Sequence, residues 1–540
     1  MTDPPTPSGT DARLPGVLGT LDAADQSIGG FPPLPLERDP VTPRWGKVLD
    51  QTRCIGCHAC TTACKSENEV PLGVTRTYVK SVDVGLFPNT RRAFQVTRCN
   101  MCEDAPCVAA CPTSAMYKRE DGLVDFDKSI CIGCKACIAA CPYDAIFINP
   151  EDHSAEKCNF CAHRLEVGLE PACVVVCPVE AIFVGDLNDP NSRVSRAVDR
   201  QPVSVRRPEK ETRPKVFYQG ASQMTLDPLA ATRPTGDTYM WSEIPAGPHD
   251  VGSGHPGRGN SSAAALLSYD VSHKAPWDWR VSLYTWTKGM AAGVYLVAIL
   301  LAFLDVIPWS SAAIVGTAPV VAATMLASTG ALLVWDLSHP ERFYLIFTRP
   351  QWTSWLVRGG VIIMAFGALL TAQFIAGLLG WDIARWLALA GVPLAIMTAV
   401  YTAFLFAQSK GRDLWQSPLL PPHMLVQAVL AGGALTVLVA EALHASIVEP
   451  AAWITAAAAL VHLGFVLGEA TLTHPTAHAR LAAHEMIAGR YAIPFWIGAV
   501  AVTAAVFAPL LPVAGAISAL VGLFGYEHAY VQGGQAVPLA

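Results

Sequence analysis

All sixteen cysteines of this 540-residue chain lie between Cys54 and Cys177. They fall into four groups of four, and the first and third groups share the spacing C-x2-C-x2-C-x3-C. Three thiolates in such a run bind three corners of an iron-sulfur cubane, and the fourth reaches a neighbouring cluster. The groups are Cys54, Cys57, Cys60 and Cys64; Cys99, Cys102, Cys107 and Cys111; Cys131, Cys134, Cys137 and Cys141; and Cys158, Cys161, Cys173 and Cys177.

Zinc binding and disulfide formation are the alternative uses of so many cysteines. Structural zinc normally takes two separated C-x2-C pairs, whereas three cysteines in one run followed by Cys-Pro would crowd a tetrahedral ion. Proline follows Cys111, Cys141 and Cys177, and Lys65 replaces it after Cys64. The first residues show no twin-arginine pair and no apolar signal region, so we expect reduced thiolates. The spacing predicts four 4Fe-4S clusters with all sixteen cysteines as iron ligands.

Composition divides the chain into four predicted segments. Residues 1–45 are rich in Pro, Gly, Asp and Thr, which predicts an extended or disordered stretch. Residues 46–187 form the cysteine domain, where strand-like runs such as GLVDF and DAIFI alternate with cysteine-bearing turns. Residues 188–276 are dense in Pro, Gly and charge, which is typical of a linker or a partner-docking segment. Residues 277–540 are predicted to be an all-α membrane domain.

The membrane prediction rests on hydropathy. Mean hydropathy is +0.34 and 52% of the residues are hydrophobic, which is too apolar for an ordinary soluble protein. We expect about eight spans, with six to eight as the range because Pro509 and Pro512 bound a tight turn between the last two. The stretches lie near 283–304, 311–335, 353–379, 384–407, 421–443, 450–470, 490–509 and 512–531. Small residues at helical spacing, such as Gly293 and Gly432, predict close helix packing.

Loop charge predicts the orientation of the bundle in the membrane. With eight spans, the loops on the side of the cysteine domain carry six basic residues, and the opposite loops carry only Arg385. Basic loops stay in the cytoplasm. We therefore expect a multi-pass protein of the inner cell membrane with its cysteine domain in the cytoplasm. The six residues are Arg342, Arg349, Lys410, Arg412, Arg480 and Arg490.

The order of the cysteine groups resembles that of a known family. The second group reads CNMCEDAPC and the last reads KCNFC and PACVVVCP, as in the iron-sulfur subunits of dimethyl sulfoxide, polysulfide and thiosulfate reductases and formate dehydrogenase. The resemblance covers residues 50–187 and implies an α+β fold of the bacterial-ferredoxin type with two diclusters. It also implies that the groups pair first with fourth and second with third. The implied sets are Cys54, Cys57, Cys60 and Cys177; Cys64, Cys158, Cys161 and Cys173; Cys99, Cys102, Cys107 and Cys141; and Cys111, Cys131, Cys134 and Cys137.

The C-terminal half is similar to NrfD, the family of quinone-reactive membrane anchors that includes the polysulfide reductase membrane subunit. The matching stretches are YTWTKGMAAGVYL, DLSHPERF with RPQWTSW, and the terminal GGQAVPL. In those families the two modules are usually separate subunits, so their fusion here fixes a stoichiometry of one to one. The resemblance implies a separate catalytic subunit, of the molybdopterin type, and membrane quinone or quinol as the exchangeable substrate.

Polar residues inside the predicted spans are candidates for quinone and proton chemistry, because lipid burial of such groups is costly. Tyr284 and Lys288 share one helix face, and Asp336 ends the next span at the same level. These three are the predicted quinone site; the alternative is that Lys288 snorkels or pairs with Asp336 to hold two helix ends together. The predicted proton relay is Glu441, His462 and Glu469, and the alternative for these residues is hydrogen bonding between helices.

Haem is not expected, because only His462 lies well inside a span and no second histidine is predicted to face it. Nucleic acid is not an expected partner either, since the net charge is −6 and no basic patch is interleaved with aromatics. The sequence predicts an electron-transfer and membrane-anchor subunit of a respiratory oxidoreductase, which carries the quinone half-reaction and leaves substrate chemistry to a partner. The alternative is the electron-transfer module of a membrane-bound hydrogenase or of a ferredoxin:quinone oxidoreductase.

Overall fold

The structure is a computed structural model, and it describes residues 42–85, 89, 91–232, 265–271, 273–381 and 383–540. Residues 43–540 form one compact unit. The predicted disordered segment 1–45 lies outside the described residues except for 42–45, and Trp45 already begins the first strand.

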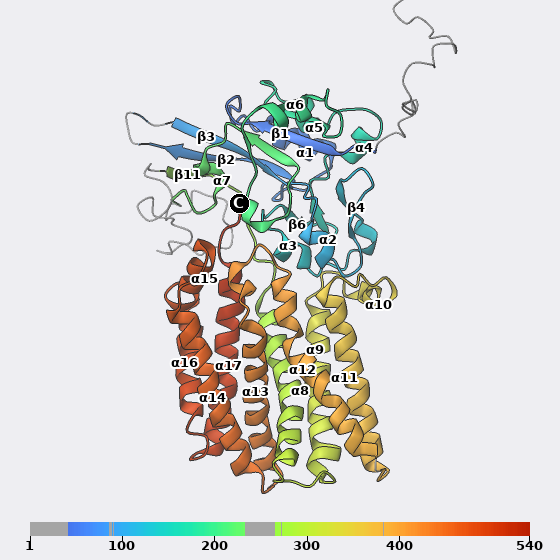
Figure 1. The fold of residues 1–540 in the computed structure, drawn as a ribbon, viewed down its shortest axis with the longest axis vertical. Helices are drawn as coiled ribbons and strands as arrows, with labels where there is room; N and C mark the ends of the chain where they lie inside the picture. The colour runs from blue at the N-terminus through green and yellow to red at the C-terminus, as the bar shows by residue number, and fades with distance from the viewer. Residues whose placement is uncertain (1–41, 86–88, 90, 233–264, 272, 382) are drawn as a thin grey trace, which may run out of the picture. The chain divides into compact units, whose positions relative to one another are not determined.

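Short strands form the cysteine domain around its cysteine turns (Figure 1). In one sheet, β1 (Trp45–Asp50) pairs in parallel with β10 (Val216–Gln219) and antiparallel with β8 (Ile182–Asp186), and β9 (Val203–Ser204) extends the sheet beyond β10. A second sheet has the order β11-β2-β3, from Ala265–Tyr269, Thr77–Val84 and Arg91–Arg98. Two hairpins pair β4 (Met116–Lys118) with β5 (Val124–Phe126) and β6 (Ile146–Ile148) with β7 (Ala155–Lys157). The α+β fold that the family resemblance implied is observed.

The helices of this domain are short, and five of them contain a cysteine or start directly after one. Pro106 opens α2 because its missing N–H is not needed in a first turn. The helices are α1 (Ala59–Glu67), α2 (Pro106–Ala110), α3 (Ala136–Ala140), α4 (Ala162–Leu165), α5 (Ala172–Val175), α6 (Arg193–Arg200) and α7 (Gln223–Leu226).

The segment 188–276 is more than a linker, which corrects part of our prediction. Its described parts include α6, β9, β10, α7 and β11, and β10 lies in the middle of the first sheet. Tyr218 of β10 is fully buried. Pro and Gly mark turns between these short elements, so their density did not indicate an unfolded chain. Residues 233–264, where the linker prediction also falls, lie outside the described residues.

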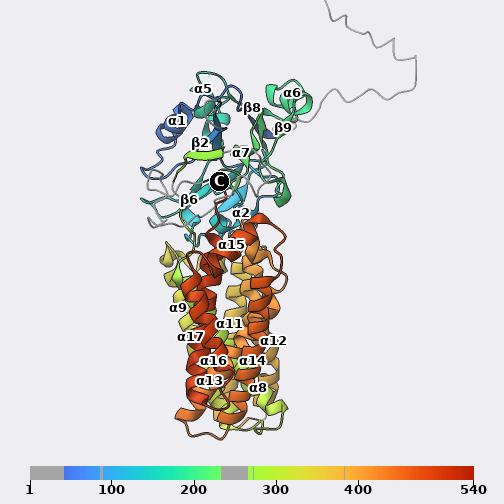
Figure 2. The same ribbon diagram turned by 90° about the vertical axis from the view of Figure 1, so that its left-hand side faces the viewer.

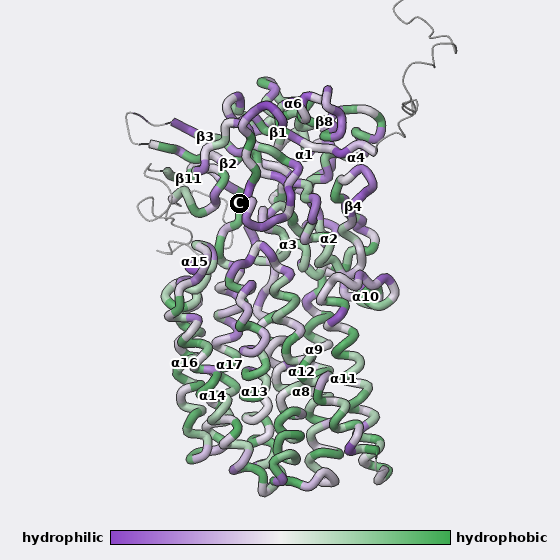
Figure 3. The backbone as a smooth tube through the Cα atoms, in the orientation of Figure 1, coloured by the Kyte–Doolittle hydropathy of each residue, from purple (hydrophilic) through white to green (hydrophobic). Residues whose placement is uncertain are grey.

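The C-terminal half is a bundle of long apolar helices (Figures 1, 2 and 3). Six helices of the described residues are long and apolar enough to cross a membrane, and a seventh span results if α15 and α16, which meet at 70°, count as one. The eight predicted spans correspond to α8 (Trp279–Phe303), α9 (Ala318–Trp335), α11 (Trp355–Leu378), α12 (Ile383–Ala407), α13 (Leu420–Ala442), α14 (Val448–Thr471), α16 (Ala492–Ala505) and α17 (Pro512–Gln535), with α10 (Leu345–Thr348) and α15 (Ala477–Ile487) between them.

Glycines let two central helices of the bundle touch. A Cβ atom placed on Gly432 of α13 would lie 1.9 Å from the carbonyl carbon of Gly293 in α8. No side chain fits there, so the two backbones are in direct contact. The sequence signal for close packing is therefore confirmed at this pair.

Candidate functional site

The two cysteine runs of identical spacing fold in the same way. Gly56 and Gly133 both have positive φ, and the residues two places later, His58 and Lys135, adopt the left-handed conformation with φ of 58° and 61°. A helix starts directly after each of these residues. The turn folds the cysteines of the run around one point, which is the conformation that the C-x2-C-x2-C spacing needs.

Cysteines from different sequence groups act on one another electrostatically, and none of the sixteen forms a disulfide. We sort them into the four sets that the family resemblance implies. We number them site 1 (Cys54, Cys57, Cys60, Cys177), site 2 (Cys64, Cys158, Cys161, Cys173), site 3 (Cys99, Cys102, Cys107, Cys141) and site 4 (Cys111, Cys131, Cys134, Cys137).

Mutual electrostatic effects show the proximity within each set. Burial raises the pKa of Cys54, and charge on Cys177 and Cys57 of site 1 raises it further. Burial also raises the pKa of Cys64, and the other three cysteines of site 2 add to the rise. The same holds for the pKa of Cys107 in site 3 and of Cys137 in site 4, each raised by burial and by the other three members of its set. Four buried thiolates together need positive charge between them, which iron would supply.

The four sites follow one another in a row. The pKa of Cys60 in site 1 is raised by burial and also by Cys173 of site 2. Burial and a site 2 thiolate together raise the pKa of Cys99 in site 3, and a site 3 thiolate contributes to the raised pKa of Cys137 in site 4. The order is therefore site 1, site 2, site 3, site 4. Helices α1 and α5 of the first two sites lie away from the bundle, and α2 and α3 of the last two lie next to it (Figure 1).

The residues of site 4 fit a cluster. All four of its cysteines line one cavity, together with apolar side chains such as Met116 and Ile132. Backbone amides point at the sulfur atoms, since Met116 N donates to Cys111 Sγ at 3.3 Å and Ala155 N donates to Cys131 Sγ at 3.4 Å. Among the residues that the structure describes, no group of three His, Cys, Asp or Glu is arranged to hold a single metal ion. A cavity ringed by four thiols suits a cubane.

Comparisons with known proteins agree with this geometry. Residues 90–187 match a 4Fe-4S dicluster domain, and residues 268–525 match the family described as polysulphide reductase, NrfD. The sequence is 40% identical to a tetrathionate reductase subunit of Salmonella typhimurium over 241 residues, which cover 42% of this chain and 93% of that protein. It is 42% identical to a polysulfide reductase component of Wolinella succinogenes over 177 residues, 32% of this chain and 93% of the relative.

This protein belongs to the iron-sulfur subunit family of respiratory reductases. Its second half is an NrfD-type membrane domain, so an electron-transfer module and a multi-pass anchor share one polypeptide. The predicted family, function and iron-sulfur character are confirmed at this level. The role of each cysteine as an iron ligand stays a prediction.

Site 4 of this iron-sulfur protein lies against the bundle. Lys135 donates to Asp336 at the end of α9 at 3.1 Å, and Arg342 donates to the carbonyl of Cys131 at 3.1 Å. Gly133 packs so tightly that a Cβ atom there would lie 2.4 Å from the Cβ of Ser338. The DLSHPERF motif thus contacts the turn that carries Cys131 and Cys134.

Aromatic side chains continue from site 4 into the bundle. Trp277 Nε1 donates to the carbonyl of Cys134 at 3.2 Å, and the Trp277 ring stacks on Trp415 at 5.6 Å between centroids. Trp415 Nε1 points to the carbonyl of Tyr530 at 3.5 Å. Tyr530 lines a cavity of about 400 Å³ together with His423, Phe465 and Glu469. Buried aromatic rings therefore connect Cys134 with this cavity.

The predicted quinone trio is brought together only in part, because Tyr284 hydrogen-bonds Thr402 and interacts electrostatically with Asp336, whereas Lys288 and Asp336 do not meet. Lys288 of α8 donates to Thr402 Oγ1 at 2.7 Å and to the carbonyl of Ala399 at 2.9 Å, both on α12. Asp336 instead faces Lys135 and Arg280, the latter at 3.7 Å. The alternative reading, in which Lys288 pairs with Asp336, is not observed either. Helix pairing decides such contacts, and hydropathy does not predict it.

The structure also shows the surroundings of Tyr284 and Lys288, which include one residue that the sequence analysis did not name. Tyr284 lies in the apolar cluster at the junction, with Trp277 and Ala140 of the cysteine domain. Glu527 of α17 accepts a hydrogen bond from Thr285 at 3.0 Å and interacts electrostatically with Lys288. The sequence analysis missed Glu527, although a carboxylate inside the last predicted span was a visible signal.

The predicted proton relay is only partly brought together. His462 of α14 is buried and hydrogen-bonds His423 of α13, with 2.9 Å between Nδ1 and Nε2. Glu469 lies on the same helix as His462 and lines the cavity that His423 borders. Glu441 is exposed at the opposite end of α13 and is separated from both. The interpretation that no second histidine faces His462 is wrong, because His423 faces it from the first turn of α13, at the edge of the predicted span.

Proposed function

We propose that this chain passes electrons between a catalytic subunit and membrane quinone through four 4Fe-4S clusters, one in each of sites 1 to 4. The observation that carries the proposal is the row of cysteine sets that ends at Trp277 and the bundle. Clusters bound there would supply one-electron transfer at closely spaced positions. The chain itself carries the quinone half-reaction and leaves substrate chemistry to its partner.

The exposed end of the row supports a catalytic partner. Cys57 is exposed, and Ile55 and Val175 beside site 1 are 56% and 62% exposed. Apolar surface next to a redox site is typical of a protein interface. We infer that the catalytic subunit docks on this face. The relatives include subunits of tetrathionate and polysulfide reductases. We infer from them that the partner is of the molybdopterin type rather than a hydrogenase or a ferredoxin. Purification of the native complex and identification of its largest subunit would distinguish these classes of partner.

At the other end, we place the quinone head group in the cavity lined by His423, Glu469 and Tyr530. Its volume of about 400 Å³ accommodates a ring, and the Trp277–Trp415 contact provides a covered route from site 4. His423 and Glu469 offer a donor and an acceptor for the quinone oxygens, and His462 behind His423 can pass a proton on. Lys288 is less suited, because Thr402 and Ala399 already accept its hydrogen bonds.

We propose that the cysteine domain lies in the cytoplasm at the inner membrane. The support is the charge of the loops on its side, six basic residues against Arg385 alone. Arg342 and Arg412 of those loops also donate to backbone carbonyls at the junction. A membrane-impermeant thiol label added outside intact cells should leave the cysteines unmodified.

Iron content and one cysteine exchange test the cluster assignment. The purified protein should hold about sixteen iron atoms and sixteen acid-labile sulfides, four of each per cubane. Cys177→Ser should damage the cluster of site 1 and spare that of site 2, although Cys173 is only four residues away. Stoichiometric zinc with little iron, or loss confined to site 2, would overturn the proposal.

A further inference from the structure

At site 2, two charged side chains hydrogen-bond a cysteine sulfur, whereas the buried Lys157 and Lys215 act on Cys99 of site 3 without a hydrogen bond to sulfur among the described residues. Arg98 Nη1 lies 3.1 Å from Cys173 Sγ, and Lys47 Nζ lies 3.7 Å from the same sulfur. Both side chains are buried, with relative exposures of 1% and 0%. Two cations therefore contact one thiolate in the interior of the domain.

The charge of Arg98 is not taken up elsewhere among the described residues. Its Nε and Nη2 are buried and have no hydrogen-bond partner. Cys173, Cys158 and Cys60 are the groups that act most strongly on its charge, although burial opposes the charged form. The groups that face the guanidinium are thus thiolates. The Lys47 ammonium lies 4.1 Å from the centre of the Phe160 ring, which shields it from solvent.

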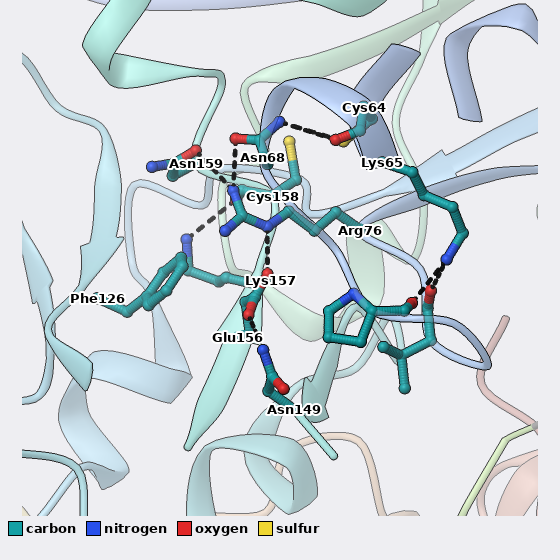
Figure 4. Close-up of polar contacts among 12 residues, drawn as sticks. Cys64, Lys65, Asn68, Arg76, Phe126, Asn149, Glu156, Lys157, Cys158 and Asn159 are labelled. Atoms are coloured by element: carbon teal, nitrogen blue, oxygen red, sulfur yellow. Dashed lines mark hydrogen bonds and ion pairs between the residues drawn. The ribbon is translucent and has the colours of Figure 1, made fainter. Parts of the chain in front are cut away.

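A nearby arginine provides the contrast (Figure 4). Arg76 pairs with the buried carboxylate of Glu156 at 2.6 Å, so its charge is neutralised. It also donates to Asn68, whose amide nitrogen lies 3.6 Å from Cys64 Sγ and 3.7 Å from Cys161 Sγ. Site 2 therefore receives amide contacts on two sulfurs and uncompensated positive charge on a third.

Reduction of a cluster adds one negative charge, so a nearby cation stabilises the reduced form more than the oxidised form. Net charge, hydrogen bonds to sulfur and burial set the potential of such clusters, and charges interact strongly where water is excluded. We propose that Arg98 and Lys47 raise the reduction potential of the site 2 cluster above those of its three neighbours. This inference rests on the proposed function. Site 2 would then be the first to take an electron, whether it arrives from the partner or from quinol.

The test is a redox titration of the purified, cluster-loaded full chain with dithionite as reductant, followed by electron paramagnetic resonance. Arg98→Gln should lower the highest midpoint potential by at least the equivalent of a tenfold change in the equilibrium constant, about 59 mV for one electron. Lys47→Met should lower the same step by less, because Lys47 is farther from the sulfur. Arg98→Lys should restore most of the shift.

Arg92→Gln is the matched control, since Arg92 lies on the same strand, is half exposed and pairs with Asp83. It should leave all four midpoints unchanged. An unchanged or raised highest midpoint in Arg98→Gln, at full iron content, would overturn the inference. Should Arg98→Gln lose iron, an unchanged midpoint in Lys47→Met would overturn it. Failure of the proposed function would show separately, as fewer than sixteen iron atoms in the wild-type protein.

Discussion

The cysteine domain and the membrane bundle bury polar groups in opposite ways. The largest fully buried side chains of the described residues include six cations, all of them before the first helix of the bundle. Buried polar groups of the bundle pair with each other across helices, as Lys288 does with Thr402 and Tyr295 with Gln373. Buried cations are stable only beside negative charge or acceptors, and the site 2 thiolates supply that charge around Arg98. The buried cations are Lys47, Lys80, Lys157, Lys215, Arg98 and Arg206.

The cysteine domain and the bundle therefore obtain their stability from different interactions. The cysteine domain has short strands and helices and a core that includes most of its cysteines. Without iron, its thiols would lose their metal partner, and Arg98 would lose the thiolates that face it. The bundle has long helices and complementary packing, and several of its buried polar groups, such as Lys288 and Tyr295, are hydrogen-bonded between helices. We therefore expect the two halves to respond differently to metal loss and to packing defects.

Iron removal should produce the largest effect. In protein produced under iron limitation, the cysteine domain should unfold while the bundle stays helical, because ligand binding contributes to folding only where the ligands lie. Limited proteolysis should cut within 46–232 and leave a protected fragment from about residue 277 onward. A cysteine domain that resists protease without iron would contradict the claim that only this domain depends on iron for its stability.

A packing defect in the bundle should have the converse effect. Gly432→Leu forces a side chain into the backbone of α8 at Gly293, which should cost on the order of several kcal/mol or prevent assembly. Thermal unfolding in detergent measures the loss. Gly464→Leu in α14 is the control, because no atom lies within 4 Å of a Cβ there, and it should change little. Equal effects of the two changes would contradict the packing account.

A smaller effect, on the pH dependence of stability, should come from His273 in the segment after β11, which contacts the cysteine domain. Burial disfavours the charge of His273, but Asp144 and Asp270 outweigh it and raise the pKa of His273 to about 9. A raised pKa stabilises the fold below the unfolded value of about 6.5, and this stability is lost as pH rises through about 9. The loss is at most about 3.4 kcal/mol, because one pKa unit corresponds to about 1.36 kcal/mol. Unfolding measured between pH 6 and 10 should show it.

His273→Gln tests the origin of that pH dependence. The variant should be less stable than the wild type at pH 6 and should lose the slope between pH 6.5 and 9, because no proton is taken up. A slope of unchanged size in the variant would assign the pH dependence to other groups.

The contrast between the cysteine domain and the bundle also explains which features could be predicted from the sequence. The cysteine sets follow from spacing and family order, because three of the four ligands of each site lie within sixteen residues of one another. The contacts of Lys288, Asp336 and His462 depend on which helices pack together, and apolar periodicity does not specify that. Hydropathy located the helices to within a few residues, whereas Pro and Gly content hid the strand Val216–Gln219.

The junction also shows a limit of charge counting. Arg342 was assigned to a cytoplasmic loop from its charge alone, and the structure uses it to bind the carbonyl of Cys131. Lys135, which pairs with Asp336, lies in a cysteine motif and was not considered for the membrane half. Residues with two possible roles need the three-dimensional contact before one role can be assigned.

Quinol-driven reduction of the clusters tests the central claim most directly. The oxidised, purified protein is mixed anaerobically with a short-chain quinol, and the visible absorbance of the clusters is followed. We predict bleaching in the wild type and a large loss of its rate in His423→Phe at unchanged iron content, because the ring at position 423 then loses its hydrogen bonds to quinol and His462. No bleaching in the wild-type protein with full iron content would contradict electron exchange between quinone and the clusters of this protein.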